Sequence, residues 1–265
     1  MSTRAVRVAV ALVAAVLMAG TSGAYAAVGG ITTFTDPAGN VSQPEDITTG
    51  PDGALWFTNF ANGRIGRITT GGAITTFTDP AGNVDLPDGI TTGPDGALWF
   101  TSSNNKRIGR ITTSGAITTF TDPADTVDHP FDITAGPDGN VWFTDFRSNV
   151  VGRITPAGVI TTFTDPAGNL DGLGEIALGS DGALWFTSMN NFRIGRITTA
   201  GAITTFTDPA GNVALPRGIS SGPGTDVWFA STNSDRIGRI ATTGPPPGPP
   251  PVPPEPVVVA PRFTG

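Results

Sequence analysis

The sequence contains no cysteine and only one histidine. Without cysteine the chain forms no disulfide bond, and thiol chemistry is excluded. Zinc-spaced clusters, a phosphate-cradling glycine loop and a serine nucleophile elbow are also missing. The fold must therefore be held together by burial and by its topology.

Long apolar runs are missing as well, apart from Val8–Met18 near the amino terminus. Arg4 and Arg7 precede this run, and a small-residue stretch ending at Ala26 follows it. This is the layout of a secretory signal peptide, with cleavage expected after Ala26. Because the run is too short for a stable membrane anchor, we expect a secreted, extracellular protein with no membrane span.

Positive charge is scarce, with 15 basic against 22 acidic residues in the whole chain. Removal of residues 1–26 takes away two arginines and no acidic residue, which leaves a net charge of −9 (13 minus 22). An acidic surface repels phosphate backbones, so nucleic acid is excluded as a partner.

Repetition dominates the rest of the sequence. The stretch "GPDGALWFT" begins at Gly50 and returns unchanged at Gly93, and three variants of it follow. The tryptophans of the five copies are spaced by 43 residues: Trp56, Trp99, Trp142, Trp185 and Trp228. Repeats of this length with an aromatic signature are typical of propeller blades.

One unit divides into four short strands: Asp88–Gly93, Ala97–Ser102, Arg107–Thr113 and Ala116–Asp122. The units show no helical spacing, and turn signals fall about every eight to twelve residues, which excludes the helical repeats of similar length. The apolar run Leu98–Phe100 points side chains to both faces of its sheet, so both faces must be covered. The sequence therefore predicts an all-β fold, a β-propeller of five four-stranded blades.

The two ends of the array complement each other. It begins at Ile31 with a fourth strand, "ITTFTD", and finishes with a third strand at Arg236–Thr243. We expect the N-terminal strand to complete the last blade and close the ring, since closure hides the sheet edges. The predicted parts are a signal peptide (1–26), the propeller (27–244) and a proline-rich tail (245–265) that acts as a stiff spacer.

Two further features recur in every unit and predict contacts. A glycine inside each third strand should mark close approach of an aromatic ring from a neighbouring blade. These glycines are Gly66, Gly109, Gly152, Gly195 and Gly238.

We also expect the repeated arginines to pair with the aspartates of "TFTDPA". The arginines are Arg67, Arg110, Arg153, Arg196 and Arg239, and the aspartates are Asp36, Asp79, Asp122, Asp165 and Asp208.

The motifs "GPDGALWFT", "NKRIGRIT" and "GAITTFT" together resemble the virginiamycin B lyase family of streptogramin-inactivating propellers, over residues 29–243. Members of that family usually have seven blades, and the five units here are a departure. The resemblance implies a magnesium-assisted elimination that opens the ester of a cyclic depsipeptide antibiotic. It also implies a histidine before the "GI" of the first strand and a glutamate after "WFT", which would serve as base and partner.

No unit keeps that pair. The histidine position holds Glu45, Asp88, Phe131, Gly174 and Arg217, and the glutamate position holds Asn59, Ser102, Asp145, Ser188 and Ser231. The family fold is thus expected without the family catalyst. His129, two residues before a matching position, is the candidate for a shifted general base near Asp132 or Asp145; the alternative is a solvated loop residue.

Substitutions among the five units collect in two windows, one before the first strand and one after "WFT". In a four-stranded blade these two loops open onto the same end of the ring. We predict a ligand-binding face there, and the alternative is free drift of loops that bear little packing. The predicted binding residues are Glu45, Asn59, Asp88, Ser102, Phe131, Asp145, Ser188, Arg217 and Ser231.

The acidic side chains of these windows predict either a site for magnesium or calcium or a solvated acidic rim. The candidate metal ligands are Asp46, Asp132, Asp145 and Glu175.

Three functions remain open at this point. The first is a non-catalytic propeller that binds an extracellular small molecule, peptide, glycan or cation. The second is an active lyase or lactone-opening enzyme for a streptogramin-like cyclic depsipeptide, and the third is a structural or adhesive surface module on the proline tether. Near-identical units favour the first or third function, because one active centre needs residues that differ between blades.

Overall fold

The computed structural model describes residues 30–242. Of these, residues 35–242 belong to one compact unit, and residues 30–34 belong to another. The described residues contain nineteen strands, two single-turn 3₁₀ helices, η1 (Phe60–Asn62) and η2 (Thr232–Ser234), and no α-helix. None of their helices is long and apolar enough to cross a membrane. The predicted signal peptide and proline-rich tail lie outside the described residues.

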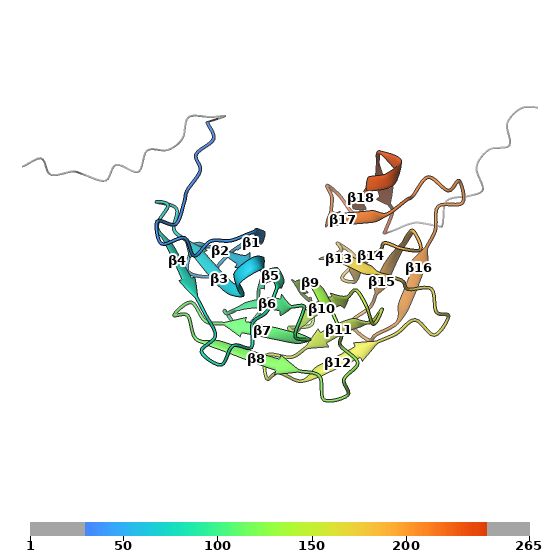
Figure 1. The fold of residues 1–265 in the computed structure, drawn as a ribbon. Coiled ribbons are helices and arrows are strands. Elements are labelled where there is room, and N and C mark those ends of the chain that lie inside the picture. Colours follow the sequence, from blue (N-terminus) through green and yellow to red (C-terminus); the bar gives the residue numbers. More distant parts are fainter. Residues whose placement is uncertain (1–29, 243–265) are drawn as a thin grey trace, which may run out of the picture. The chain divides into compact units, whose positions relative to one another are not determined.

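The strands form five sheets that follow one another along the chain (Figure 1). The first sheet contains β1 (Pro44–Thr49), β2 (Leu55–Asn59), β3 (Arg64–Ile68) and β4 (Ile74–Phe77). The second contains β5 (Pro87–Thr92), β6 (Leu98–Ser102), β7 (Arg107–Ile111) and β8 (Ile117–Thr121). The third contains β9 (Pro130–Ala135), β10 (Val141–Asp145), β11 (Val151–Ile154) and β12 (Ile160–Phe163). The fourth contains β13 (Leu173–Leu178), β14 (Leu184–Ser188), β15 (Arg193–Ile197) and β16 (Ile203–Phe206). The fifth contains β17 (Pro216–Ser221), β18 (Val227–Ser231) and β19 (Arg236–Ile240).

Every sheet is an antiparallel meander in chain order, as the strand assignment predicted. The repeated "GPDG" turns join the first strand to the second: the N–H of Gly50 bonds to the carbonyl of Ala54 at 2.8 Å. The prediction of an all-β propeller with five blade units is confirmed.

The last sheet differs from the prediction because it has three strands among the described residues. The segment Ile31–Asp36, which was expected to be its fourth strand, is not a strand in the structure. The predicted closure of the ring by the N-terminal strand is therefore not found.

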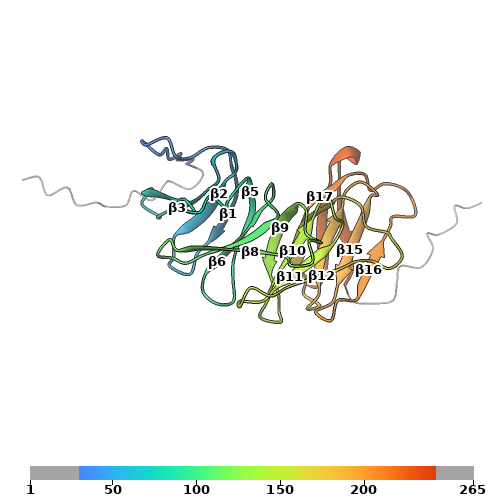
Figure 2. The same cartoon turned by 60° about the horizontal axis from the view of Figure 1, so that its bottom comes forward.

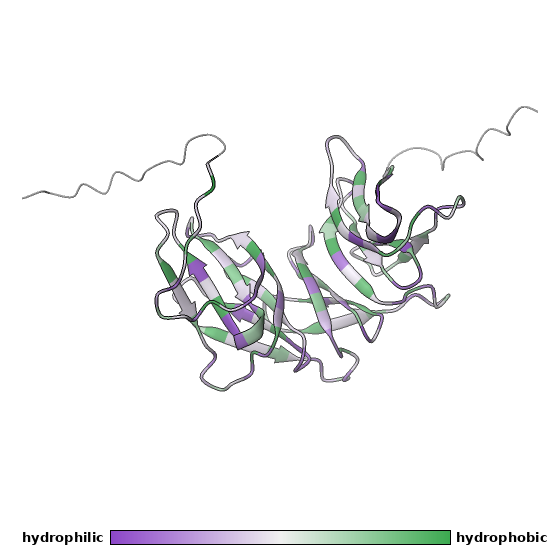
Figure 3. Ribbon diagram, turned by 45° about the horizontal axis from the view of Figure 1, so that its top comes forward, coloured by the Kyte–Doolittle hydropathy of each residue, from purple (hydrophilic) through white to green (hydrophobic). Residues whose placement is uncertain are grey.

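The first strands of successive sheets contact one another, from β1 through β5, β9 and β13 to β17. Figure 2 shows the third sheet between the second and the fourth. The cores lie between neighbouring sheets, where green, apolar segments occupy strands of every sheet (Figure 3). Between the second and third sheets, Trp99 and Ile108 pack with Ile133, Phe143 and Ile154, and all five are buried. Coverage of both faces, expected from the "LWF" run, is confirmed for the second, third and fourth sheets.

A tryptophan of the second strand stacks on a phenylalanine of the fourth strand in each complete sheet, and an arginine and an aspartate lie beside the tryptophan. Trp99 stacks on Phe120 with ring centroids 5.6 Å apart, and the Arg110 guanidinium lies 6.0 Å from the Trp99 ring. Asp95 accepts hydrogen bonds from Trp99 Nε1 (2.9 Å) and from Arg110 Nε (2.6 Å). These bonds hold the pKa of Asp95 below its usual range, although burial opposes them as the largest single effect.

The predicted partners of the repeated arginines were wrong. Arg67, Arg110 and Arg196 pair with the aspartates of the "PDG" or "SDG" turns of their own sheets at 2.6–2.7 Å. The aspartates of "TFTDPA" instead accept backbone N–H groups of their own turn, as Asp79 does from Ala81 and Asn83. A short acceptor in a turn satisfies local N–H groups first, which leaves the arginine to a neighbour across the sheet.

The prediction for the third-strand glycines was wrong in one respect. An aromatic ring does lie over each of them, but it comes from the second strand of the same sheet. Phe100 pairs with Gly109 in register, and a Cβ at Gly109 would lie 2.0 Å from Phe100 Cζ. Only glycine leaves room for the ring at this position.

Candidate functional site

Both variable windows meet at one end of every sheet. The start of the first strand pairs with the end of the second, as Pro87 does with Ser102 and Pro130 with Asp145. The constant turns join strands at the opposite end, where Thr92 pairs with Leu98. The predicted shared end of the two windows is confirmed, and we call it the variable face.

A β-bulge shapes each first strand at this face. In the first sheet, Glu45 and Asp46 both lie opposite the single residue Thr58, because the register shifts between Pro44 and Ile47. All five sheets repeat this shift. A bulge re-aims the side chains of its extra residue. The histidine position of the family pattern is thus the first bulge residue, and the candidate metal ligands Asp46, Asp132 and Glu175 occupy the second.

The "WFT" threonines connect the bulges of successive sheets. Each threonine hydroxyl donates to the backbone carbonyl of the first bulge residue in the next sheet. The pairs are Thr58 with Asp88 (2.7 Å), Thr101 with Phe131 (2.8 Å), Thr144 with Gly174 (2.6 Å) and Thr187 with Arg217 (3.0 Å). These bonds hold the predicted binding residues of the histidine position on a common row across the variable face.

Carboxylates of the second bulge position form a second set of links. Asp46 Oδ2 accepts from Ile90 N at 2.8 Å, and Asp132 Oδ2 accepts from Ile176 N at 2.8 Å. Glu175 Oε2 accepts from Ile219 N at 3.3 Å. Each carboxylate therefore ties its own sheet to the next one.

The four candidate metal ligands do not come together as a metal site. Within residues 30–242, no group of three or more His, Cys, Asp or Glu side chains is placed to hold a metal ion. Asp145 differs from the other three candidates because it binds the loop of its own sheet. It is fully buried and accepts hydrogen bonds from the backbone N–H groups of Asp128 and His129 at 2.8 Å. Magnesium and calcium prefer several converging oxygen ligands, which this arrangement does not supply.

Asp132 is the most perturbed acid of the variable face. Burial of its carboxyl group raises its pKa to about 7, although part of the residue's surface stays exposed. The N–H groups of Ile176 and Ile133 oppose this shift, and the negative charges of Asp46 and Glu175 add to it. Near neutral pH the link to Ile176 is thus made by a carboxyl group that is partly protonated.

Asp88 shows the same effect at the first bulge position. Burial raises its pKa to about 6, a hydrogen bond from the Ser103 side chain lowers it, and the charge of Glu45 raises it further. The structure therefore brings Glu45 and Asp88 close enough to repel each other. Glu45 and Arg217 are exposed, Phe131 is half-buried and Gly174 is buried.

The residues of the glutamate position lie beneath the face, and all are at most 2 % exposed. Each of them binds the backbone of the loop that precedes the first strand. Ser102 Oγ accepts from Asp85 N (2.8 Å), Ser188 Oγ from Asp171 N (2.9 Å) and Ser231 Oγ from Ala214 N (2.8 Å). Asn59 Oδ1 accepts from Ser42 N at 3.2 Å, and Asp145 plays the same part for Asp128. These five predicted binding residues shape the variable face from below.

His129 lies half-buried between the second and third sheets. Its Nδ1 atom is buried and has no hydrogen-bond partner among residues 30–242. Burial is the main cause that lowers its pKa, and the charge of Arg147 lowers it further, against Asp145 and Asp128. The surroundings of His129 therefore favour the neutral imidazole.

Ser103 and Phe146 also belong to this part of the face, and neither is among the binding residues predicted from the sequence. Ser103 is fully buried, and its hydroxyl donates to the Leu86 carbonyl at 2.8 Å. The Phe146 ring packs edge-on against His129 with centroids 6.1 Å apart, and it lies 6.4 Å from the Phe131 ring. Both stand two residues after "WFT", directly after the glutamate position, so their place in the second window was the signal that could have identified them.

The sequence profile of the virginiamycin B lyase family matches residues 9–174 and 169–246, which together cover most of the chain. The chain belongs to the virginiamycin B lyase family. A catalytically inactive virginiamycin B lyase from Staphylococcus aureus, solved with quinupristin, is 40 % identical, with a TM-score of 0.74. The match covers 82 % of this chain and 73 % of that one.

Two other solved lyases agree with this assignment. A selenomethionine-substituted virginiamycin B lyase from the same organism is 37 % identical, with a TM-score of 0.69, over 82 % of this chain and 75 % of that one. A streptogramin B lyase is 31 % identical, with a TM-score of 0.66, over 77 % and 70 %. A comparison with curated protein sequences gave no match. The family match and the three solved lyases confirm the resemblance found in the repeated motifs.

Proposed function

We propose that this member of the virginiamycin B lyase family is exported and binds a peptide-like ligand on its variable face without opening it. The observation that supports this most strongly is the burial of the five side chains at the glutamate position. All five side chains there are buried and already hydrogen-bonded to their own loops. A general base must reach the proton that it removes, and these buried groups are not accessible to a ligand on the surface.

The exposed part of the face favours binding over proton transfer. Glu45 and Asp88 supply negative charge, Arg217 supplies positive charge, and Phe131 supplies an aromatic surface beside Phe146. Groups of this kind bind amides and aromatic rings through hydrogen bonds and stacking. A cyclic depsipeptide presents both, and one relative was solved with the streptogramin quinupristin. Quinupristin is therefore the first probe.

The experiment is an isothermal titration of the secreted protein with quinupristin. We expect saturable binding that is weakened about fivefold or more in Phe131→Ala and Asp88→Asn, since truncation of a central contact costs more than about 1 kcal/mol. Thr70→Ala, in a constant turn at the other end of its sheet, should leave the affinity unchanged. No binding, or equal affinity in all four proteins, would contradict the proposal.

An active lyase with a rearranged site is the second candidate, and His129 supports it. A neutral imidazole with a free Nδ1 atom is a suitable general base. The Nδ1 atom is buried, however, so this function needs a movement of Phe146 or of the surrounding loop before a ligand can reach it. Such an enzyme would convert quinupristin, whereas the binding protein would not.

A further inference from the structure

The last sheet has an open outer edge. In the four complete sheets the third strand pairs with a fourth strand that contains "ITTF": β4, β8, β12 and β16. β19 has the same sequence, "RIGRI", as β3, β7 and β15, yet nothing pairs with its outer side among the described residues. An unpaired edge is a template for another strand.

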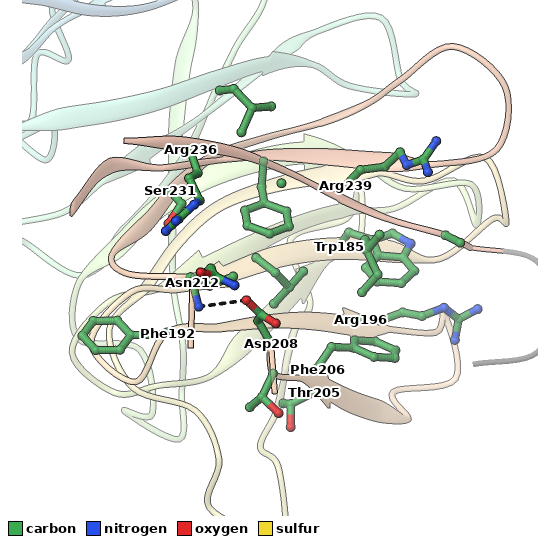
Figure 4. Close-up of a pocket in the computed structure, with 18 of the residues that line it drawn as sticks. Trp185, Phe192, Arg196, Thr205, Phe206, Asp208, Asn212, Ser231, Arg236 and Arg239 are labelled. Atoms are coloured by element: carbon green, nitrogen blue, oxygen red, sulfur yellow. Dashed lines mark hydrogen bonds between the residues drawn. The ribbon is translucent and has the colours of Figure 1, made fainter. Parts of the chain in front are cut away.

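A cavity of about 1080 Å³ lies beside this edge. Trp185, Phe206 and Phe229 line it together with backbone and side chains of β19 (Figure 4). In the other interfaces the corresponding place holds the first isoleucine of a fourth strand, which packs on the core between two sheets. These isoleucines are Ile117, Ile160 and Ile203. Among the described residues, the core between the fourth and fifth sheets contains no such isoleucine.

The chain contains one further copy of the missing strand. Residues Ile31–Phe34 read "ITTF", identical to β4, β12 and β16. Ile31 is 93 % exposed and Phe34 is 50 % exposed, whereas the same residues of β4 are half-buried. The turn that follows is also the same, because Asp36 accepts from Ala38 and Asn40 as Asp79 does in the next unit.

The outward faces of the first and last sheets are also exposed and apolar. On the first sheet, Ile47 is 57 % exposed, although its counterpart Ile90 is buried against the sheet before it. On the last sheet, Trp228 and Ile237 are 38 % and 72 % exposed, although the corresponding residues of the other sheets are buried. These two faces correspond to the two sides of every interface between neighbouring sheets within the chain.

We propose that the Ile31–Phe34 segment of one copy pairs with β19 of a second copy and fills the cavity beside it. Ile31 would pack on Trp185 and Phe206, as Ile203 packs in the preceding interface. The turn at Asp36 would then lead into the first sheet of the donor, whose exposed face meets Trp228 and Ile237 of the acceptor. Strand pairing and face packing thus form one continuous interface between copies.

A second copy is favoured as the donor by the comparison with a longer propeller. The five sheets share their arrangement with the quinupristin-bound lyase at a TM-score of 0.74 but cover only 73 % of it. A ring of that curvature has room for further sheets between the last sheet and the first. The chain therefore cannot pack its own first sheet on its last sheet unless the angle between every pair of neighbouring sheets changes. A head-to-tail contact of this kind joins different surfaces of the two copies.

This interface should be weaker than those within the chain. Ala230 stands where the other units have the bridging threonine, and Gly218 stands where Asp46, Asp132 and Glu175 tie one sheet to the next. Both hydrogen-bonded links are therefore missing at the contact. We therefore expect the association to be reversible, with the associated fraction rising as the protein concentration is raised.

The edge can be blocked without disturbing the rest of the sheet. In the first sheet the N–H of Thr69 bonds to Ala73, and N–H groups alternate sides along a strand, so Ile65 also faces the fourth strand. Ile237 is the counterpart of Ile65, and its N–H faces the open edge. Ile237→Pro removes this donor and keeps the pairing with β18, whereas Ile237→Val keeps both.

The test is sedimentation velocity of the secreted protein and three variants. We expect concentration-dependent association of the wild type and of Ile237→Val, but monomers for Ile237→Pro and for a deletion of residues 27–35. An equimolar mixture of the last two should form a one-to-one complex, because one protein supplies only the strand and the other supplies only the edge. This complex also shows that both variants are folded.

Several results would overturn the proposal. A wild type that stays monomeric at its highest soluble concentration excludes a donor from a second copy. Association of either single variant alone assigns the contact to another surface. As an independent measurement, a synthetic peptide of residues 29–38 should bind the deletion variant and dissociate the wild-type assembly, and a scrambled peptide should not. Failure of the peptide to bind the deletion variant also contradicts strand pairing.

Discussion

Asp132→Asn should make the stability of the protein much less dependent on pH between pH 5 and 8. Burial raises the pKa of Asp132 to about 7, against an ordinary value of 3.8. The folded state therefore holds a proton on this group that the unfolded state has lost, and the free energy of unfolding falls as the pH rises from about 4 to 7. Asparagine carries no proton at any of these values, so this contribution disappears.

The magnitude follows from the size of the shift. Each unit is worth about 1.4 kcal/mol, so the wild type should lose roughly 2–3 kcal/mol between pH 5 and 8 through this group. The partial exposure of the residue places the value at the lower end of that range. Asparagine keeps one acceptor for the N–H groups of Ile133 and Ile176 and loses the other, which costs about 1–3 kcal/mol at both pH values.

The assay is urea denaturation of both proteins at pH 5 and pH 8. We expect Asp132→Asn to be clearly less stable than the wild type at pH 5 and to match or exceed it at pH 8. Asp208→Asn is the control: turn N–H groups lower the pKa of Asp208, so it is ionised in both states over this window. An equal difference between wild type and Asp132→Asn at both pH values would refute the reasoning.

Three more predictions follow from the packing and the loops. Gly109→Ala should lower the free energy of unfolding by about 2–3 kcal/mol in chemical denaturation, because its Cβ would meet the buried Phe100 ring; adding Phe100→Leu should restore part of the loss. Ser188→Ala should cost about 1–3 kcal/mol and speed amide hydrogen exchange at Asp171, whose N–H loses its acceptor, whereas unchanged exchange would contradict this role. Magnesium and calcium should leave the melting temperature unchanged, and a rise that saturates with metal concentration would restore the predicted cation site.

The repeat determined how much of the fold could be predicted. A 43-residue period, turn residues at fixed places and the "LWF" run fix the number of sheets, the strand order and the burial of both faces. The predicted strand Asp88–Gly93 differs from the observed β5 (Pro87–Thr92) by one residue at each end. Local patterns of this kind depend on nearest neighbours in the chain, which is why the sequence reveals them.

Contacts across the sheet were harder to predict. An aspartate in "PDG" is typical of a turn, yet Asp95 also accepts a hydrogen bond from Arg110, fifteen positions later along the chain. The glutamate position was read as a binding position, and the burial of Ser102 or Ser188 depends on how the preceding loop folds back. The missing fourth strand of the last sheet depends on the curvature of the array, which no single repeat specifies.

The most direct test of the proposed function is chromatography with tandem mass spectrometry of quinupristin after incubation with the protein lacking residues 1–26 and with magnesium. Elimination leaves the mass unchanged, so a linear product is recognised by its retention time and fragmentation, and hydrolysis would add one water. An active virginiamycin B lyase serves as the positive control. Our account predicts that cyclic quinupristin is recovered intact at protein concentrations that saturate binding. A linear product that forms with the wild type and fails to form with His129→Gln would contradict it and identify the chain as an enzyme.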